Sequence, residues 1–246
     1  MSNSYFRFKQ FTIHHDRCAM KVGTDGVLLG AWAELPAEGC VLDIGTGSGV
    51  VALMVAQRGE HLQVTGIDID ADAVSQAAEN AAASPFASRV RMLATSLLDY
   101  TESATSSLPA QALLFDAVVC NPPYHEETLL PPDAQRRDAR HTVSMPFSQL
   151  VDCASRLLAD GGTLSVVQPS QAFDSFNQLC EQSGLRLSRL CHVRTTPRKQ
   201  PKRVLATFRK QAAAVASSPV VEELVLQDGP ARSAAYAALT EAFYLY

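Results

Sequence analysis

Apolar and polar positions follow two rhythms that alternate along the chain. Short apolar runs rich in β-forming residues occupy residues 40–44, 62–68, 89–93, 114–120 and 163–168. Helical spacing of apolar residues covers residues 50–57, 71–83, 147–159 and 171–183. This alternation predicts βαβ units, and therefore an α/β protein with a mostly parallel sheet and helices on both faces.

The C-terminal third follows a different pattern. Residues 185–194 and 203–209 are strand-like, and the gap between them is too short for a helix, so they predict an antiparallel hairpin at the sheet edge. We therefore expect a seven-stranded sheet, with residues 221–226 as a candidate for one more strand. Residues 231–243 predict a closing helix, and the Ser/Ala/Pro-rich residues 101–111 predict a loop.

Composition narrows the class of protein. Apolar residues make up 47% and charged residues 19% of the 246 residues, as in a globular domain with a sizeable core. No apolar run approaches about 18 residues and the N-terminus lacks a secretory pattern, so we expect a cytoplasmic protein without a membrane span. The six cysteines lack metal-site spacing, and Cys40 and Cys120 lie in apolar runs. We expect buried, reduced thiols and no metal.

A glycine-rich turn follows the first strand of the α/β region. It reads Asp43-Ile-Gly45-Thr-Gly47-Ser-Gly49, and Asp68 ends the next strand. Glycines at this spacing let the backbone approach a ligand closely, and the following helix points its free N–H groups toward that ligand. An acid at the end of the second strand suits the two hydroxyls of a ribose. The acid before the turn fits a sulfonium or amino group better than a pyrophosphate, which favours S-adenosylmethionine over NAD.

The second chemical signature is Asn121-Pro122-Pro123-Tyr124, directly after the strand at 114–120. The Asn121 side-chain oxygen and the Pro122 carbonyl can each accept one N–H of a planar amine. Two such acceptors hold the nitrogen and aim its lone pair, so catalysis rests on alignment and fixed dipoles. Tyr124 can stack on a base that has been turned out of its strand.

Basic residues are concentrated toward the C-terminus although the net charge is −4. Seven of the 21 lysines and arginines lie between residues 194 and 210: Arg194, Arg198, Lys199, Lys202, Arg203, Arg209 and Lys210. Two interpretations stay open at this point, a solvated hairpin that resists aggregation and an RNA-contacting surface. Arg140 is a further candidate for a phosphate contact near the second signature.

Together these motifs resemble class I S-adenosylmethionine-dependent methyltransferases that modify exocyclic or amide nitrogens. The segment from Phe8 to Phe11, residues 15–32 and residues 139–141 are similar to the bacterial tRNA(Val) adenine-N6 methyltransferase family, which modifies tRNA position 37. The similarity runs from residue 8 to residue 208. It implies a Rossmann-like fold, with residues 1–38 as an extension packing on the active site, 39–210 as the catalytic domain, and 211–246 as linker, strand and closing helix.

The resemblance also implies a role for individual residues. The cofactor is expected to contact Asp43, Gly45, Gly47, Gly49, Asp68, Ser96 and Asn121, with Lys21 and Thr24 near the cofactor or the entering base. The target base is expected at Asn121, Pro122, Pro123 and Tyr124. The clustering of basic residues, rather than the resemblance, predicts contact with tRNA at Arg140, Arg194, Arg198, Lys199, Lys202 and Arg203. Family members usually carry an acid after the third strand, where this chain has Ser96, with Asp99 three residues later. A serine there lacks the charge-assisted hydrogen bond of a carboxylate.

Three hypotheses about activity follow from the sequence. The first is transfer of a methyl group to adenine N6 in tRNA by a monomer. The second retains the cofactor but changes the acceptor to a protein glutamine or an rRNA guanine. The third is a non-catalytic RNA-binding protein that retains the cofactor fold.

Overall fold

The computed structural model describes residues 3–106, 114–122, 145–211 and 218–245. Its strands are β1 (Tyr5–Arg7), β2 (Thr12–His14), β3 (Glu38–Ile44), β4 (His61–Asp68), β5 (Val90–Ala94), β6 (Phe115–Cys120), β7 (Leu158–Pro169), β8 (Leu185–Arg194), β9 (Arg203–Lys210), β10 (Val220–Val225), β11 (Gln227–Asp228) and β12 (Ala231–Arg232). Its helices are α1 (Thr24–Trp32), α2 (Val50–Arg58), α3 (Ala71–Ala82), α4 (Leu97–Ser106), α5 (Phe147–Leu157), the short 3-10 turn η2 (Ser170–Ala172), α6 (Phe173–Gln182) and α7 (Ala234–Thr240).

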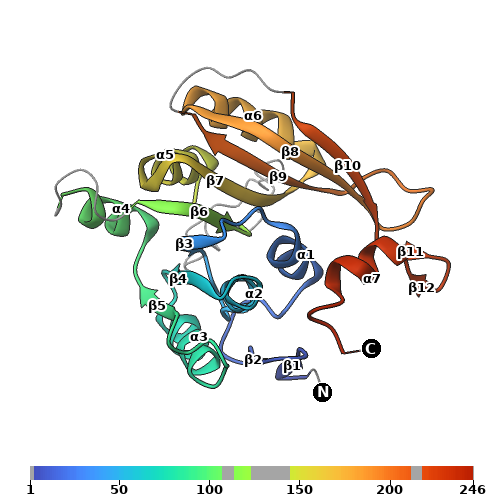
Figure 1. Ribbon diagram of the computed structural model, residues 1–246, viewed down its shortest axis with the longest axis horizontal. Helices are drawn as coiled ribbons and strands as arrows, with labels where there is room; N and C mark the ends of the chain where they lie inside the picture. Colours follow the sequence, from blue (N-terminus) through green and yellow to red (C-terminus); the bar gives the residue numbers. More distant parts are fainter. Residues whose placement is uncertain (1–2, 107–113, 123–144, 212–217, 246) are drawn as a thin grey trace, which may run out of the picture.

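The central sheet has the strand order β10-β8-β9-β7-β6-β3-β4-β5 (Figure 1). The strands from β7 to β5 are parallel, and β9 runs antiparallel to both β7 and β8. Apolar side chains alternate between the two faces, so Val41 and Val64 pack toward α1 and α2, while Leu42 and Ile67 pack in the core that includes α4, α5 and α6. The predicted α/β architecture is therefore confirmed.

The prediction of seven strands with the hairpin at the edge was wrong by one strand. Val220–Val225 pairs in parallel with β8 and becomes the eighth strand, so the β8–β9 hairpin lies inside the sheet. The cause is a second long-range pairing: β8 has an open edge, and β10 fills it and buries Leu224. The residues that precede this strand, 212–217, lie outside the described part of the chain.

Three helices differ from the prediction for local reasons. Residues 101–106 belong to α4 and not to a loop, because Ser96 accepts the backbone N–H of Asp99 and starts the helix. The helix α1 was not predicted, since its residues from Gly26 to Trp32 are all buried and show no helical alternation. The closing helix α7 is shorter than expected and begins at Ser233, whose hydroxyl caps it.

The two ends of the chain pack against each other. Phe8 forms an isolated β-bridge with Tyr244, the two rings are stacked, and the backbone N–H of Lys9 donates to the carbonyl of Phe243. Figure 1 shows the β1–β2 hairpin beside the segment that follows α7. None of the helices formed by the described residues has the length and apolar character needed to span a bilayer.

Candidate active site

The sequence motifs meet at one edge of the sheet. Because β3, β4, β5 and β6 are adjacent and parallel, their carboxyl ends lie side by side. The glycine turn follows β3, Asp68 ends β4, and Asn121 follows β6 on the other side of β3. The predicted cofactor and base positions are therefore neighbours in the fold, although 78 residues separate Asp43 from Asn121 in the chain.

The glycine turn has a backbone that only glycine adopts readily. Gly45, Gly47 and Gly49 have φ angles of 70°, 52° and 82°, all in the left-handed region. A Cβ atom on Gly45 or Gly47 would meet nothing within 4 Å, whereas one on Gly49 would press on Met92 and Ala77. The first two glycines thus border open space, and the third allows α2 to start close to its neighbours.

The Asp43 side chain stabilises this turn through two buried hydrogen bonds. Its carboxylate accepts hydrogen bonds from the Thr46 hydroxyl at 2.7 Å and from the backbone N–H of Ala52 at 3.1 Å. The side chain is only 1% exposed, and burial raises the pKa of Asp43 to about 7, against the effect of those two hydrogen bonds. Direct contact between Asp43 and a cofactor stays a prediction, while its role in the turn is visible.

The raised pKa of Asp43 predicts a pH-dependent stability. In the unfolded chain this carboxyl ionises near pH 3.8, but in the folded protein it keeps its proton up to about pH 7. The free energy of unfolding therefore falls as pH rises from about 3.8 to about 7. Below this range Asp43 is protonated in both the folded and the unfolded chain, so it does not make stability depend on pH there. We expect the isosteric Asp43→Asn variant to gain stability relative to wild type, by up to about 4 kcal/mol between pH 4 and pH 7. Urea unfolding of both proteins at several pH values measures this difference, and a difference that does not vary with pH would contradict it.

Asp68 links the second strand to the glycine turn. One carboxylate oxygen accepts the N–H of Gly47 at 2.9 Å, and the other accepts the N–H of Asp70 at 3.0 Å. Asp70 then caps α3 through the N–H groups of Asp72 and Ala73. Ile69, which the sequence patterns did not single out, directly follows Asp68 and is 63% exposed. Its side chain offers an apolar contact beside the acid for which a ribose is predicted.

Ser96 lies at the carboxyl end of β5, next to β4, as expected. Its hydroxyl donates to the Asp99 carboxylate at 2.6 Å and accepts the Asp99 N–H at 3.1 Å. This reciprocal pair is a helix cap, so the serine's first role is to begin α4. Contact of Ser96 or Asp99 with the cofactor stays a prediction.

Asn121 lies beside the N-terminal turn of α1. A Cβ atom on Gly26 would lie 3.8 Å from the Asn121 side-chain nitrogen, so the two elements are in van der Waals range. Thr24 is the first residue of α1, and Lys21 is exposed just before it. The structure therefore places the first turn of α1, which Thr24 begins, beside Asn121. Pro123, Tyr124 and Arg140 lie outside the described residues.

Comparison with known proteins bears on this geometry. The family model of the methyltransferase small domain matches residues 21–182. A tRNA1(Val) (adenine(37)-N6)-methyltransferase of Phocaeicola vulgatus is 43% identical over 246 residues, which cover 100% of this chain and 99% of that protein. One of Bacteroides fragilis is 45% identical over 208 residues, 85% of each chain. The chain belongs to the tRNA1(Val) (adenine(37)-N6)-methyltransferase family.

A solved structure agrees with the fold of this methyltransferase. The crystal structure of a predicted O-methyltransferase of Agrobacterium tumefaciens aligns with a TM-score of 0.64 and 21% identity, covering 91% of this chain and 98% of that one. At this level of identity the match concerns the fold alone. It confirms the Rossmann-like class I methyltransferase fold that the resemblance implied.

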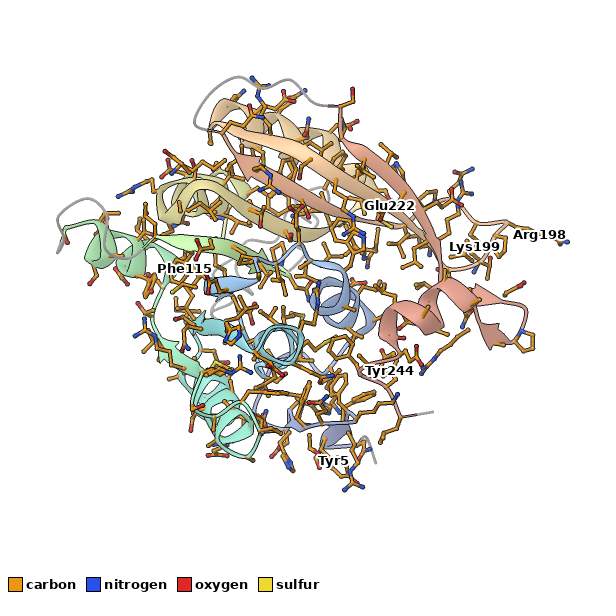
Figure 2. The ribbon with its side chains drawn as sticks, viewed as in Figure 1. Tyr5, Phe115, Arg198, Lys199, Glu222 and Tyr244 are labelled. Carbon is orange, nitrogen blue, oxygen red and sulfur yellow. The ribbon has the colours of Figure 1, made fainter. Side chains whose placement is uncertain are left out.

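In this methyltransferase the basic residues between 194 and 203 form two groups, one with acidic partners and one exposed in a turn. Arg194 forms an ion pair with Glu223 at 2.8 Å, and Arg203 forms one with Asp25 at 2.9 Å. The other group comprises the exposed residues of the β8–β9 turn, Arg198, Lys199 and Lys202. Figure 2 shows Arg198 and Lys199 projecting from the margin of the molecule. Because Arg203 pairs with Pro169 at the carboxyl end of β7, this turn lies on the same sheet edge as Asn121.

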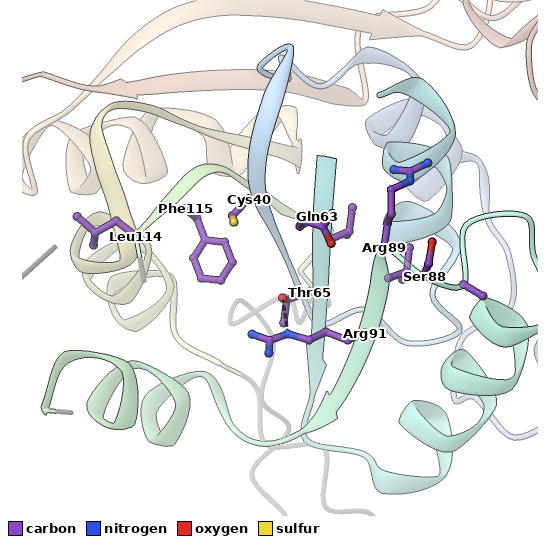
Figure 3. Close-up of a pocket in the computed structure, with 11 residues that line it drawn as sticks. Cys40, Gln63, Thr65, Ser88, Arg89, Arg91, Leu114 and Phe115 are labelled. Carbon is purple, nitrogen blue, oxygen red and sulfur yellow. Dashed lines mark hydrogen bonds between the residues drawn. The ribbon is translucent and has the colours of Figure 1, made fainter. Parts of the chain in front are cut away.

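A cavity of about 440 Å³ opens at the opposite edge of the methyltransferase sheet. Side chains from the amino ends of the strands line it, among them Cys40, Thr65, Arg91 and Phe115 (Figure 3). Cys40 is exposed there, which corrects the expectation that it is buried, whereas Cys120 is buried as expected. The strands point away from this cavity toward the glycine turn, so it plays no part in the candidate active site.

Proposed function

We propose that this methyltransferase transfers a methyl group from S-adenosylmethionine to N6 of adenine at position 37 of tRNA1(Val). The observation that carries the proposal is the position of Asn121 and Pro122, directly beside the glycine turn at the carboxyl edge. The full-length relatives support it, since they are tRNA1(Val) (adenine(37)-N6)-methyltransferases by name.

The residues at this edge fit the cofactor. Gly45 and Gly47 border open space with a backbone free of side chains, and Asp68 offers carboxylate oxygens to ribose hydroxyls. The exposed Ile69 suits the adenine ring of the cofactor. When bound, S-adenosylmethionine supplies an electrophilic methyl group on a positively charged sulfur.

The chain's own contribution to chemistry is to hold the acceptor nitrogen. The adenine amino group is a poor nucleophile because its lone pair is delocalised into the ring. The Asn121 oxygen and the Pro122 carbonyl accept its two hydrogens, which localises electron density on nitrogen and fixes the direction of attack. Proline lacks an N–H that would compete as a donor. After methyl transfer the nitrogen is positively charged and releases one proton to water, so no strong base is needed for the methylation step.

The direct test is product analysis. Labelled S-adenosylmethionine is incubated with the protein and with RNA from cells that lack the enzyme, and the RNA is digested to nucleosides. The label is expected in N6-methyladenosine. Label in methylguanine, label in no nucleoside at all, or binding of RNA without any transfer would replace the proposal with one of the other two hypotheses.

We further propose that the β8–β9 turn contacts the tRNA backbone. Replacing Arg198, Lys199 and Lys202 together by glutamine should weaken tRNA binding at low salt. The fall of log K with log salt should also become less steep, with a slope smaller in magnitude by about two to three. A triple variant of the exposed Arg7, Lys9 and Arg186, with the same charge change elsewhere on the surface, is the control. Equal salt slopes for the turn variant and wild type would exclude this surface.

A further inference from the structure

A buried asparagine joins three separate segments of the chain. Asn80 lies in α3 and is 2% exposed. Its amide nitrogen donates to the carbonyl of His14 at 2.8 Å and to the carbonyl of Ser48 at 2.9 Å, while its oxygen accepts the N–H of His14 at 3.0 Å. Ser48 belongs to the glycine turn and His14 ends β2. The hydrogen bonds of one side chain thus connect the N-terminal segment to the turn that borders the cofactor site.

Gln76 repeats this arrangement one helical turn earlier. It is also 2% exposed, and its amide nitrogen donates to the Asp16 carboxylate at 2.7 Å. Its oxygen accepts the N–H of Arg17 at 3.0 Å and the Cys18 thiol at 3.2 Å. Positions 76 and 80 lie on the same face of α3, so the two amides hold residues 14–18 along that helix.

The segment held in this way continues past Asp68 toward α1. The thiol of Cys18 donates to Gln76 on α3, the helix that Asp70 caps directly after Asp68. Burial raises the pKa of Cys18 to about 11, and the carboxylates of Asp70 and Asp68 contribute to this rise. The buried ring of His15 then accepts the N–H of Val22 at 3.4 Å, which folds the chain back before Thr24. Residues 14–22 therefore run from α3, past the ribose-binding acid, to the helix beside Asn121.

We propose that Gln76 and Asn80 are positioning residues for the cofactor site. They hold residues 14–18 as a wall on the Asp68 side of the crevice, and Asn80 fixes the Ser48 carbonyl of the glycine turn at the same time. This inference rests on the proposed cofactor. It assigns a function to the N-terminal segment that neither the glycine motif nor the Asn-Pro-Pro-Tyr motif explains.

The test uses Asn80→Asp and Gln76→Glu, which keep the shape and the acceptor but lose the amide donors. Hydrogen–deuterium exchange of the protein without cofactor should become faster at residues 14–18 in both variants. Calorimetry should show S-adenosylhomocysteine binding about tenfold or more weaker, as expected when buried carbonyls lose their donors. With saturating cofactor, kcat on tRNA should change less than about threefold, because Asn121 is not displaced.

Thr207→Val is the matched control. In the wild-type protein the Thr207 hydroxyl forms a hydrogen bond with the Ser165 hydroxyl at 2.9 Å and is fully buried. Thr207 lies in β9, away from the glycine turn. The variant should lower Tm to a similar extent while leaving S-adenosylhomocysteine affinity unchanged. Unchanged exchange at residues 14–18, unchanged affinity in the α3 variants, or an equal loss of affinity in Thr207→Val would each overturn the inference. Failure of the wild-type protein to bind S-adenosylhomocysteine would instead refute the proposed function, and the exchange measurement would still report on the two amides.

Discussion

Replacing Asn121 by alanine is expected to lower methyl transfer to tRNA by about 10²–10³-fold, the usual effect of removing one fixed polar group that acts in the transition state. The side chain lies beside the first turn of α1 and next to the glycine turn, so its loss removes an acceptor without disturbing the sheet. Single-turnover kinetics with saturating tRNA measure the effect, and calorimetry should show S-adenosylhomocysteine binding within about threefold of wild type.

Asn121→Asp is the informative companion to this variant. It retains an acceptor oxygen at the same position and is expected to keep more activity than Asn121→Ala. If Asn121→Ala lost cofactor binding as severely as it lost transfer, Asn121 would belong to the cofactor pocket and the base would have to be held elsewhere.

The second large effect is expected at Asp68, on the cofactor side. Asp68→Ala should weaken S-adenosylhomocysteine binding about 10–100-fold, because charge-assisted hydrogen bonds to ribose hydroxyls are lost. Asp68 also accepts the N–H of Gly47, so part of the loss comes from a less ordered glycine turn. Asp68→Asn separates these contributions, since it keeps an acceptor for Gly47 but not the charge. An unchanged dissociation constant for Asp68→Ala would contradict the ribose role.

Local patterns explain why the edge that carries the candidate site could be predicted from sequence. The glycine turn and Asn121 each follow a strand directly, Asp68 ends one, and parallel strands place their carboxyl ends together. Nothing beyond the order of strands is needed to bring these residues close. The serine at position 96 was likewise placed by counting from its strand.

Other parts of the structure depend on contacts between distant residues. Without β10 the central sheet would end at β8 and at β5, and the sequence of Val220–Val225 does not indicate which of the two edges it pairs with. The hydrogen bonds of Asn80 span 66 residues to His14. A signal was nevertheless present, since Gln76 and Asn80 are amides at helical spacing within an alanine-rich helix. Polar residues on the buried face of such a helix indicate a specific partner.

The ion pairs of the basic residues in the β8–β9 hairpin could not be predicted from the sequence either. The sequence shows seven basic residues but not which of them already have acidic partners. The ion pairs of Arg194 with Glu223 and of Arg203 with Asp25 become visible only when the strands and α1 are assembled. The proposal of an RNA contact therefore now centres on the exposed residues of the turn.

The most direct test of the central claim is methylation of a single position. The protein is given labelled S-adenosylmethionine with unmodified tRNA1(Val), and in parallel with the same tRNA carrying guanine in place of adenine 37. The account predicts N6-methyladenosine at position 37 of the first RNA and no label in the second. Equal labelling of both RNAs, or labelled guanine in the second, would contradict it.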